Sequence, residues 1–543
     1  MRLRAAAAGM PQQLNLARFL SLATNVVLIL LICRTSTLCH FALLFFYMNR
    51  ALRHIFLLFA AIFIAAQSSH AQIPIQFHTT YATPPDSVDS VRMNKRHFWR
   101  ASAEVVGFNL GLWAFDRYVQ HGDFSYISFK TIKENFKHGF YWDNDKLGTN
   151  TFLHPYNGNL YFNAARANGF NFWQSELFAI AGSGMWEMFM EREYPSTNDI
   201  IATPIGGAAI GEILFRASDA VLDDRLTGGA RFERELAAFI LSPMRGINRL
   251  VTGDMWKVRP TRGRQFGTPN LALRVSLGYK MLEYNGKFNS IHQGVGAQID
   301  LEYGDRFEVK STKPYDYFSV KAQLQFMKTQ PLLTQMEIKG RLLAREIFDS
   351  YRSKGSIGLY QHFDFYDSDT IDNIKKVPFK LGIPASVGAG FMFRDIERRR
   401  WVYDLYAHAN VIALGSILSD HYQTDERNYN WASGFSLKAG FNIVFDKSRL
   451  SFSLSHNYYR LFTWKGYRYG TDLRLVDFRV LNVMGDKSVA SLNMTEFRAD
   501  FKIWKRLFGT FLFTNYYRSS HYTDFSDIKT NSISLSVMLS YKF

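Results

Sequence analysis

The sequence predicts a mainly β transmembrane barrel of about twelve antiparallel strands, preceded by an N-terminal α-helical domain. Three observations support this fold class. From about residue 270 to the end, apolar side chains alternate with small or polar ones. Between residues 72 and 265, apolar residues instead recur at helical spacing. Residues 48–71 have the composition of an export signal, which a protein of the outer membrane requires.

The alternation is clearest in the last eleven residues. One face holds Ile533, Leu535, Val537, Leu539, Tyr541 and Phe543, and the other holds Ser534, Ser536, Met538, Ser540 and Lys542. A strand between lipid and a polar lumen has this pattern, because successive side chains point to opposite faces. Tyr541 and the terminal Phe543 also resemble the sorting signal of Gram-negative outer-membrane barrels. The resemblance implies the cell outer membrane as the location, with barrel-insertion machinery and outer-membrane lipid as partners.

Segment counting places the strands of the predicted barrel between residues 266 and 543. They are expected near 270–283, 288–303, 315–328, 332–347, 354–366, 378–394, 401–416, 431–445, 449–463, 489–504, 507–520 and 529–543. Arg and Lys at every second position should face the lumen, since lipid would penalise them. The short turn at 328–331 falls where a long outer loop is expected, so ten or fourteen strands are alternatives.

The export signal does not begin at residue 1. Residues 48–53 are basic, residues 55–66 are apolar, and Ser69-His70-Ala71 forms a small-residue cleavage site. We interpret residues 1–47 as an over-extended reading frame, with a true N-terminal anchor as the alternative. Residues 1–71 hold six arginines and no acidic residue, which leaves 58 basic and 47 acidic residues and a net charge of +11. Both cysteines lie upstream of Met48, so the mature chain contains no disulfide.

Residues 72–265 form the predicted helical domain, with helices near 100–120, 124–138, 158–168, 172–193, 198–222 and 231–252. Thr197 is the predicted N-cap of the fifth helix. Gly207 and Gly211 lie on one face of that helix, which permits close packing against a neighbour. Acidic residues interrupt the apolar runs, which favours a packed or membrane-apposed bundle over spanning helices.

This domain also contains the densest group of polar residues. The group comprises Asp143, Asp145, His154, Tyr161, Arg166, Glu187, Glu191, Asn198, Asp199 and Glu212. We expect His154 in a turn, Tyr161 and Arg166 on the next helix, and Glu187 and Glu191 on one helix face. Such residues can serve acid–base catalysis or hold a divalent cation. The alternative is structural, with Arg166 paired to a carboxylate and the rest bonded to backbone at helix ends.

The segment from His154 to Glu212 resembles the exported-protein family known as domain of unknown function 3943. The resemblance covers roughly residues 140–255 and includes H-P-x-x-G, A-A-R, W-E, P-S-x-N-D and G-G-x-x-x-G-E elements. The family occurs in Gram-negative bacteria, and it implies a location but no activity. No catalytic role is therefore transferred to any residue.

Three functions remain open at this point. The first is a non-enzymatic outer-membrane barrel for envelope transport or structure, with a helical domain that is periplasmic or plugs the lumen. The second is a membrane-bound hydrolase that acts on lipid or another envelope component through His154 and its carboxylates. The third is a binding module in which loop 464–488 contacts an extracellular ligand. The absence of GxSxG, HExxH and P-loop motifs favours a protein that is not an enzyme. The basic residues are dispersed, so nucleic acid is not an expected partner, and no cofactor is implied.

Overall fold

A computed structural model describes residues 95–143, 145–285, 291–309, 313–369, 377–395, 401–423, 428–445, 449–476 and 485–543. Residues 1–47 and the predicted signal peptide, residues 48–71, lie outside this part of the chain.

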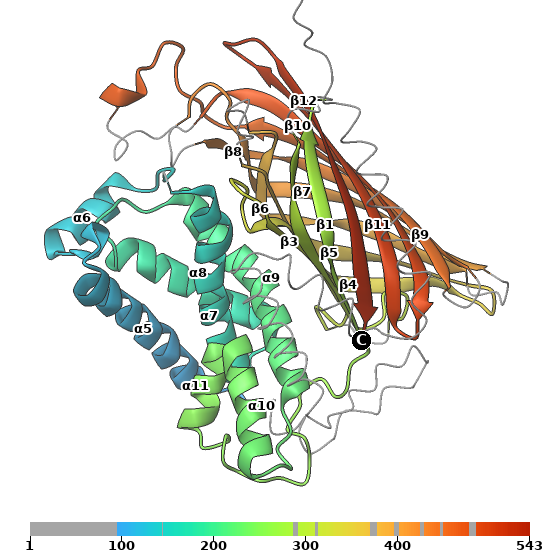
Figure 1. Cartoon of the computed structure of the whole chain (residues 1–543). Helices are drawn as coiled ribbons and strands as arrows, with labels where there is room; N and C mark the ends of the chain where they lie inside the picture. Colours follow the sequence, from blue (N-terminus) through green and yellow to red (C-terminus); the bar gives the residue numbers. More distant parts are fainter. Residues whose placement is uncertain are drawn as a thin grey trace, which may run out of the picture. The chain divides into compact units, whose positions relative to one another are not determined.

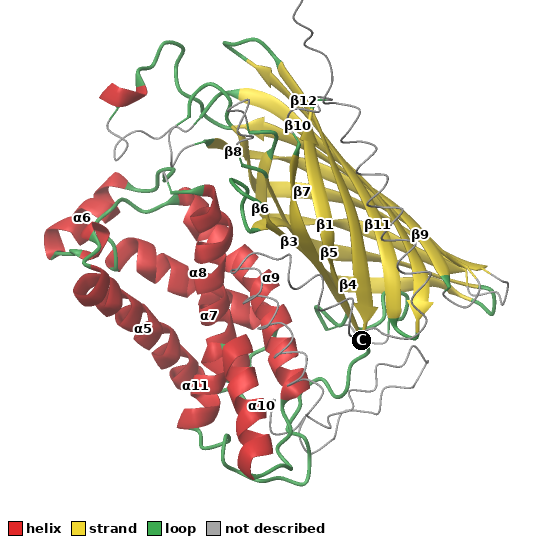
Figure 2. Cartoon of the chain, in the orientation of Figure 1, coloured by secondary structure: helices red, strands yellow, loops and turns green. Residues whose placement is uncertain are grey.

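The N-terminal part of the described chain is helical (Figures 1 and 2). Its α-helices are α5 (Phe98–Phe115), α6 (Phe129–His138), α7 (His154–Ala167), α8 (Phe172–Phe189), α9 (Thr197–Val221), α10 (Gly228–Leu241) and α11 (Pro243–Val251). Shorter helical turns are η1 (Asp116–Gln120), η2 (Asp123–Ser125), η3 (Thr149–Leu153) and, within the later strand region, η6 (Leu473–Leu475). A helix is present in each region where one is expected, although several boundaries differ.

Twelve strands follow and form a closed antiparallel barrel, which confirms the predicted fold class. They are β1 (Leu271–Tyr284), β2 (His292–Tyr303), β3 (Phe318–Phe326), β4 (Leu333–Asp349), β5 (Ser353–Asp367), β6 (Lys380–Asp395), β7 (Trp401–Leu418), β8 (Tyr429–Phe445), β9 (Leu450–Thr463), β10 (Ser488–Trp504), β11 (Leu507–Tyr522) and β12 (Ile528–Lys542). Each strand pairs with its sequence neighbours, and β1 pairs with β12 from Arg274↔Lys542 to Tyr284↔Ser532. The described strands close after twelve, which excludes the alternatives of ten and fourteen, and β3 pairs directly with β4 across their short connection.

The two faces of the barrel wall differ as the alternation predicts. On β12, Ser536 and Ser540 are buried, whereas Val537 is 62% and Leu539 is 46% exposed. Arg498 and Asp500 on β10 are buried and bond to each other on the lumen side. The apolar series therefore faces outward, and the charged series faces the lumen.

The helix boundaries near Pro243 and Thr197 differ from the sequence prediction. The predicted helix 231–252 is two helices, α10 and α11, because Pro243 cannot continue α10 and instead opens α11. The N-cap of α9 is Ser196 rather than Thr197. Ser196 has extended backbone angles and its side chain accepts a hydrogen bond from the backbone N–H of Asp199, so Thr197 is already helical.

Helices α7 and α9 pack with their backbones nearly in contact, as the glycine pattern predicts. A Cβ on Gly207 would lie 2.5 Å from the carbonyl carbon of Gly158, and one on Gly158 would lie 1.8 Å from the carbonyl oxygen of Thr203. Gly211 extends this contact towards Phe162. Only residues without a side chain fit at this crossing, so the glycines fix the spacing of the bundle.

The bundle also packs against the barrel wall. Phe152 of η3 contacts Phe365 of β5 with ring centroids 4.6 Å apart. Gln361 Nε2, on the same strand, donates to the carbonyl oxygen of Ile205 in α9 at 2.7 Å. Asp364 bonds to Lys438 in the lumen, and so the odd-numbered neighbours Gln361 and Phe365 point outward. The contacts of η3 and α9 are thus with the outward face of the wall.

Helix α9 is the one described helix that is long and apolar enough to cross a membrane, with a mean hydropathy of 1.4 over its most apolar window. That window is 67% buried within the protein. Its apolar character is therefore largely used in packing against other helices and the wall of the barrel.

Candidate functional site

The loop before η3 brings the first site residues to the start of α9. Tyr141 forms a parallel bridge with Ser196, in which Thr197 donates to the Tyr141 carbonyl oxygen at 2.7 Å. This bridge holds Asp143 and Asp145 close to the N-terminal turn of α9. The buried N-terminus of that helix supplies backbone donors and a positive dipole end beside the acidic residues.

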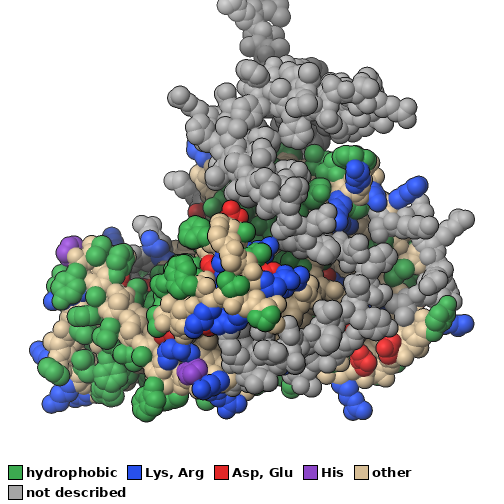
Figure 3. Space-filling model, turned by 90° about the horizontal axis from the view of Figure 1, so that it is seen from below, with side chains coloured by type: hydrophobic (Ala, Val, Ile, Leu, Met, Phe, Trp, Pro, Cys, Tyr) green, Lys and Arg blue, Asp and Glu red, His purple; other side chains and the backbone are tan. Residues whose placement is uncertain are grey.

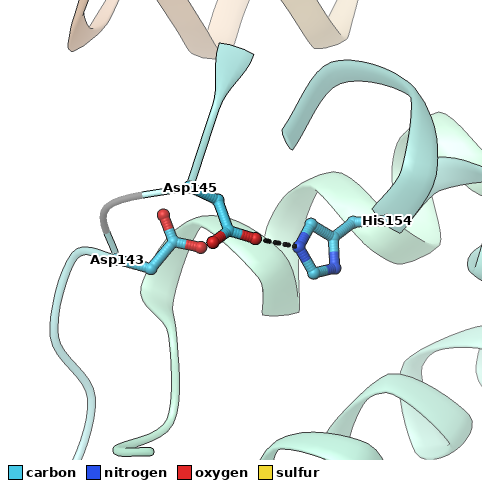
Figure 4. A group of neighbouring side chains, drawn as sticks. All are labelled: Asp143, Asp145 and His154. Carbon is cyan, nitrogen blue, oxygen red and sulfur yellow. Dashed lines mark hydrogen bonds and ion pairs between the residues drawn. The ribbon is translucent and has the colours of Figure 1, made fainter. Parts of the chain in front are cut away.

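His154 lies between two carboxylates (Figure 4 shows the pair with Asp145). It is the first residue of α7 rather than a turn residue, because η3 leads directly into the helix. Its Nε2 lies 3.2 Å from Asp145 Oδ2 and 3.6 Å from Asp199 Oδ1. Burial disfavours the imidazolium, but the bond to Asp145 and nearby negative charges outweigh it and raise the pKa of His154 to about 9.

Asp143, Asp145 and His154 form a compact set of potential ligands. One ligand atom from each lies within 4.8 Å of the others. Asp143 is buried, whereas the Asp145 side chain is 48% exposed. Two carboxylates and an imidazole at this separation can hold a divalent cation, or can orient the imidazole for proton transfer. The same contacts also suffice to pair a protonated histidine.

The glutamates occupy different structural positions, contrary to the prediction that they share a helix face. Glu187 is on α8 and accepts a hydrogen bond from the Ser196 backbone N–H at 2.7 Å. Glu191 lies beyond α8, which ends at Phe189, and the indole N–H of Trp186 donates to its carboxylate. Burial raises the pKa of Glu191 to about 7, partly offset by the Trp186 bond and His154.

An amide network that the sequence did not suggest connects this group to the barrel. Asn150 Nδ2 donates to Asp143 Oδ1 at 3.0 Å and lies 2.7 Å from the Tyr429 hydroxyl oxygen, while Asn198 Nδ2 donates to Asn150 Oδ1 at 3.0 Å. The Tyr429 hydroxyl donates to the carbonyl oxygen of Asp145 at 2.6 Å. Tyr429 is the first residue of β8, so the polar residues around Asp143 and Asp145 lie near the beginning of that strand, at one end of the barrel.

Tyr161, Arg166 and Glu212 are not bonded to His154. The Tyr161 hydroxyl donates to Asn109 on α5. Arg166 Nε and Nη2 donate to the two carboxylate oxygens of Glu212 at 2.7 and 2.9 Å, and Arg216 Nε adds a third bond at 2.9 Å. The structural alternative for Arg166 is thereby confirmed. Arg216 was missed, although its spacing of four from Glu212 on a helix is a recognisable pairing signal.

A second buried ionic group joins α10, α11 and the segment after α11. Asp224 accepts bonds from Arg231, Arg249 and Arg259 at 2.7–2.9 Å, and Glu235 pairs with Arg231 and Arg249. These side chains are largely buried. The sequence did not reveal this group, and its one local signal is the four-residue spacing of Arg231 and Glu235 on a helix.

The lumen of the barrel carries a layer of ion pairs. Lys438 Nζ lies 2.6 Å from both carboxylate oxygens of Asp364. Arg498 Nη1 on β10 lies 3.1 Å from Asp300 Oδ2 on β2. Because β10 and β2 are not neighbours in the sheet, the second pair crosses the lumen. Burying such charges costs free energy that their pairing repays only when geometry is good.

Apolar side chains pack beside this charged layer. The buried cluster comprises Tyr366, Phe379, Leu381, Ile383, Ile412, Ile417, Ala432, Tyr459, Leu461, Ala490, Leu492, Met494 and Tyr516. On β5, Tyr366 lies two residues after Asp364, and on β10, Met494 lies two residues before Glu496. Residues two apart on a strand share a face, so these cluster members also face the lumen. Phe379 stacks on Tyr516 with ring centroids 4.2 Å apart. The lumen therefore contains a charged layer and an adjoining apolar layer.

A closed antiparallel barrel with an apolar outer face and a polar lumen defines the class: a transmembrane β-barrel of the outer-membrane type. Within the helical region, residues 139–244 match the family model of Domain of unknown function (DUF3943). The match confirms the resemblance, although it ends about ten residues before the boundary estimated from sequence.

Solved barrel structures are similar to half of this chain. The NanC porin is 9% identical, covers 50% of this chain and 100% of its own, and has a TM-score of 0.25. The CymD monoaromatic hydrocarbon channel is 10% identical, with 50% and 87% coverage and a TM-score of 0.21. The Ralstonia pickettii toluene transporter TbuX is 6% identical, with 50% and 89% coverage and a TM-score of 0.20. At such low scores, the fold assignment rests on the strand topology of the chain itself.

No curated protein sequence matches the chain.

Proposed function

We propose that this protein is an integral outer-membrane barrel that admits a small polar solute through a lumen closed at rest. Export would depend on residues 48–71, and insertion would depend on recognition of Tyr541 and Phe543. Those two rings lie 4.9 Å apart, and the Phe543 backbone N–H donates to the Leu273 carbonyl oxygen at 2.9 Å. The proposed signal is thus presented at the seam between the first and last strands.

The charged lumen layer is the observation that supports a transport role. A barrel that served only as a wall could fill its interior with apolar side chains at lower desolvation cost. Ionisable residues at membrane depth instead commonly mark a solute or ion pathway. The adjoining apolar cluster is suited to act as the gate, since apolar constrictions close pores by excluding water.

The test is conductance of the purified chain, expressed from Met48, in planar lipid bilayers. Leu461→Ala combined with Leu492→Ala thins the apolar layer, and Leu454→Ala on the outward face of β9 is the matched control. We expect little conductance from the wild type and the control, and a clear increase from the double variant. A correctly folded double variant that conducts no better than the control would contradict a transport role.

A second candidate is a hydrolase acting on an envelope lipid. The specific observation is that His154 lies within 3.6 Å of both Asp145 and Asp199, so that a carboxylate can orient the imidazole for acid–base work. The test compares phospholipid, lipopolysaccharide and peptidoglycan profiles of strains carrying His154→Ala and His138→Ala, an exposed histidine of α6. A hydrolase requires a change in the first strain alone, and identical profiles would exclude this activity for His154.

A further inference from the structure

The helical domain is apolar on its outside. The most exposed large side chains of four helices are Trp99 (82%) on α5, Leu177 (65%) on α8, Ile240 (68%) on α10 and Val251 (69%) on α11. Figure 3 shows hydrophobic side chains gathered over the helical part of the face that it displays. Large apolar side chains exposed together on several helices mark an interaction surface.

The interior of the same domain contains buried ion pairs beside its apolar cluster. Buried ion pairs join α7 to α9 through Arg166 and Glu212, and α10 to α11 through Glu235 and Arg249. On α11 both arginines are buried, whereas Leu250 and Val251 face outward. On α10 Arg231 and Glu235 are buried and Phe232, Leu236 and Ile240 are exposed, with Glu233 as the one exposed acidic residue of that helix. A helix in water has the opposite arrangement, because water solvates charge and expels apolar surface.

Helix α5 shows the same polarity over its whole length. Its two charged residues, Arg100 and Glu104, both bond to the Asn168 side chain rather than facing outward. Its 18 residues correspond to about 27 Å at 1.5 Å per residue, close to the roughly 30 Å of a bilayer's hydrocarbon core. Exposed Lys95 and Arg96 precede the helix, where lipid headgroups would accept them.

The apolar surface of the helices adjoins the outward wall of the barrel. Phe162, Phe172 and Ala208 share one buried cluster with the outward-facing Ile338 and Phe363. Nearby outward residues of the wall that the helices do not cover remain exposed, including Val411 at 65%. Because one buried apolar cluster spans the helices and the outward wall, the exposed apolar side chains of both should contact the same medium.

From this continuity and polarity we propose that α5, α8, α10 and α11 contact the acyl chains of the bilayer beside the barrel. This inference rests on the proposed outer-membrane location. The helical domain would then be a lipid-exposed part of the protein with its charged pairs buried inside, in place of a periplasmic domain.

Nitroxide labels at single cysteines test this proposal, since the chain from Met48 has no cysteine of its own. Labels replace Leu110 on α5, Leu177 on α8 and Val251 on α11 in the full mature chain, reconstituted in phospholipid vesicles. Val537 on the outward face of β12 is the lipid reference, and Leu475 in η6, 85% exposed, is the water reference. Collision rates with oxygen and with a water-soluble nickel chelate are compared at each site.

We expect the three helix sites to favour oxygen over nickel as Val537 does. Nickel accessibility like that of Leu475 at the helix sites, with Val537 still in lipid, would overturn the inference and leave the barrel location intact. Nickel accessibility at Val537 itself would instead refute the outer-membrane proposal. Dipolar broadening between labels at Leu177 in separate molecules would identify a second copy of the chain as the occupant, which also overturns lipid contact.

Discussion

At the residue scale, His154 shows how a polar side chain is maintained in a largely apolar domain. Its side chain is 15% exposed and is held in place by Asp145 and Asp199 from two other segments. The surrounding carboxylates outnumber it, so its protonation state influences their combined charge.

The stability contributed by His154 should depend on pH. Its folded-state pKa of about 9 lies above the ordinary 6.5, and so the contribution is complete below about pH 6.5 and is lost as pH rises through 9. We expect His154→Gln to lower the melting temperature, followed by circular dichroism at 222 nm, most at pH 6 and least at pH 10. Asp145→Asn should shrink the same pH dependence. A wild-type to His154→Gln difference that is constant with pH would contradict the assigned ion pairs.

Removing the charge of Glu212 is expected to destabilise the helical bundle strongly. Glu212→Gln leaves Arg166 and Arg216 buried without their carboxylate. Breaking a buried ion pair in this way should lower the free energy of unfolding by about 3–5 kcal/mol. Glu233→Gln on the exposed face of α10 is the control and should change stability by less than about 0.5 kcal/mol. Urea unfolding in detergent, monitored at 222 nm, measures both. Equal stability of the two variants would refute the role given to Glu212.

At the element scale, the crossing of α7 and α9 determines the geometry of the helical domain. The crossing depends on glycines whose added Cβ atoms would meet backbone rather than movable side chains. It also positions His154 at the start of α7 against Asp199 at the start of α9.

Gly207→Ala should disrupt this crossing, because its Cβ would lie 2.5 Å from the Gly158 carbonyl carbon. We expect faster proteolysis of the helical domain while the barrel still forms. Gly111→Ala on α5 has open space around its Cβ and should raise helix stability by up to about 1 kcal/mol. If Gly207→Ala is as protease-resistant as Gly111→Ala, the backbones are not as close as described.

The sequence predicted the strands well because the period of two is local and repeats along each strand. It also predicted the glycine contact and the pairing of Arg166. The sequence wrongly placed Glu191 on a helix, because Met190 and Glu191 both have high helix propensity. The chain leaves the helix there and goes on to the bridge between Tyr141 and Ser196, which is a long-range contact. Tyr429 lies 279 residues from its partner Asn150, and no local pattern encodes such a contact.

At the scale of the whole molecule, the alternation of apolar and polar side chains along the strands gives the barrel wall two faces of opposite character. The outward apolar face allows the barrel to sit in lipid, while the inward face assembles the charged layer around Lys438 and Asp364. The helical domain uses the outward face as its packing surface, through contacts such as Gln361 with Ile205. The barrel is therefore the scaffold on which the polar group around His154 is held.

The most direct test of the account is the gel mobility of the chain expressed from Met48 in a Gram-negative host. Outer membranes are isolated, and samples are compared with and without boiling. A closed barrel resists detergent until heated, so we expect the protein in the outer-membrane fraction with different mobilities for boiled and unboiled samples. Recovery in the inner membrane or periplasm, with one mobility under both conditions, would contradict the outer-membrane barrel.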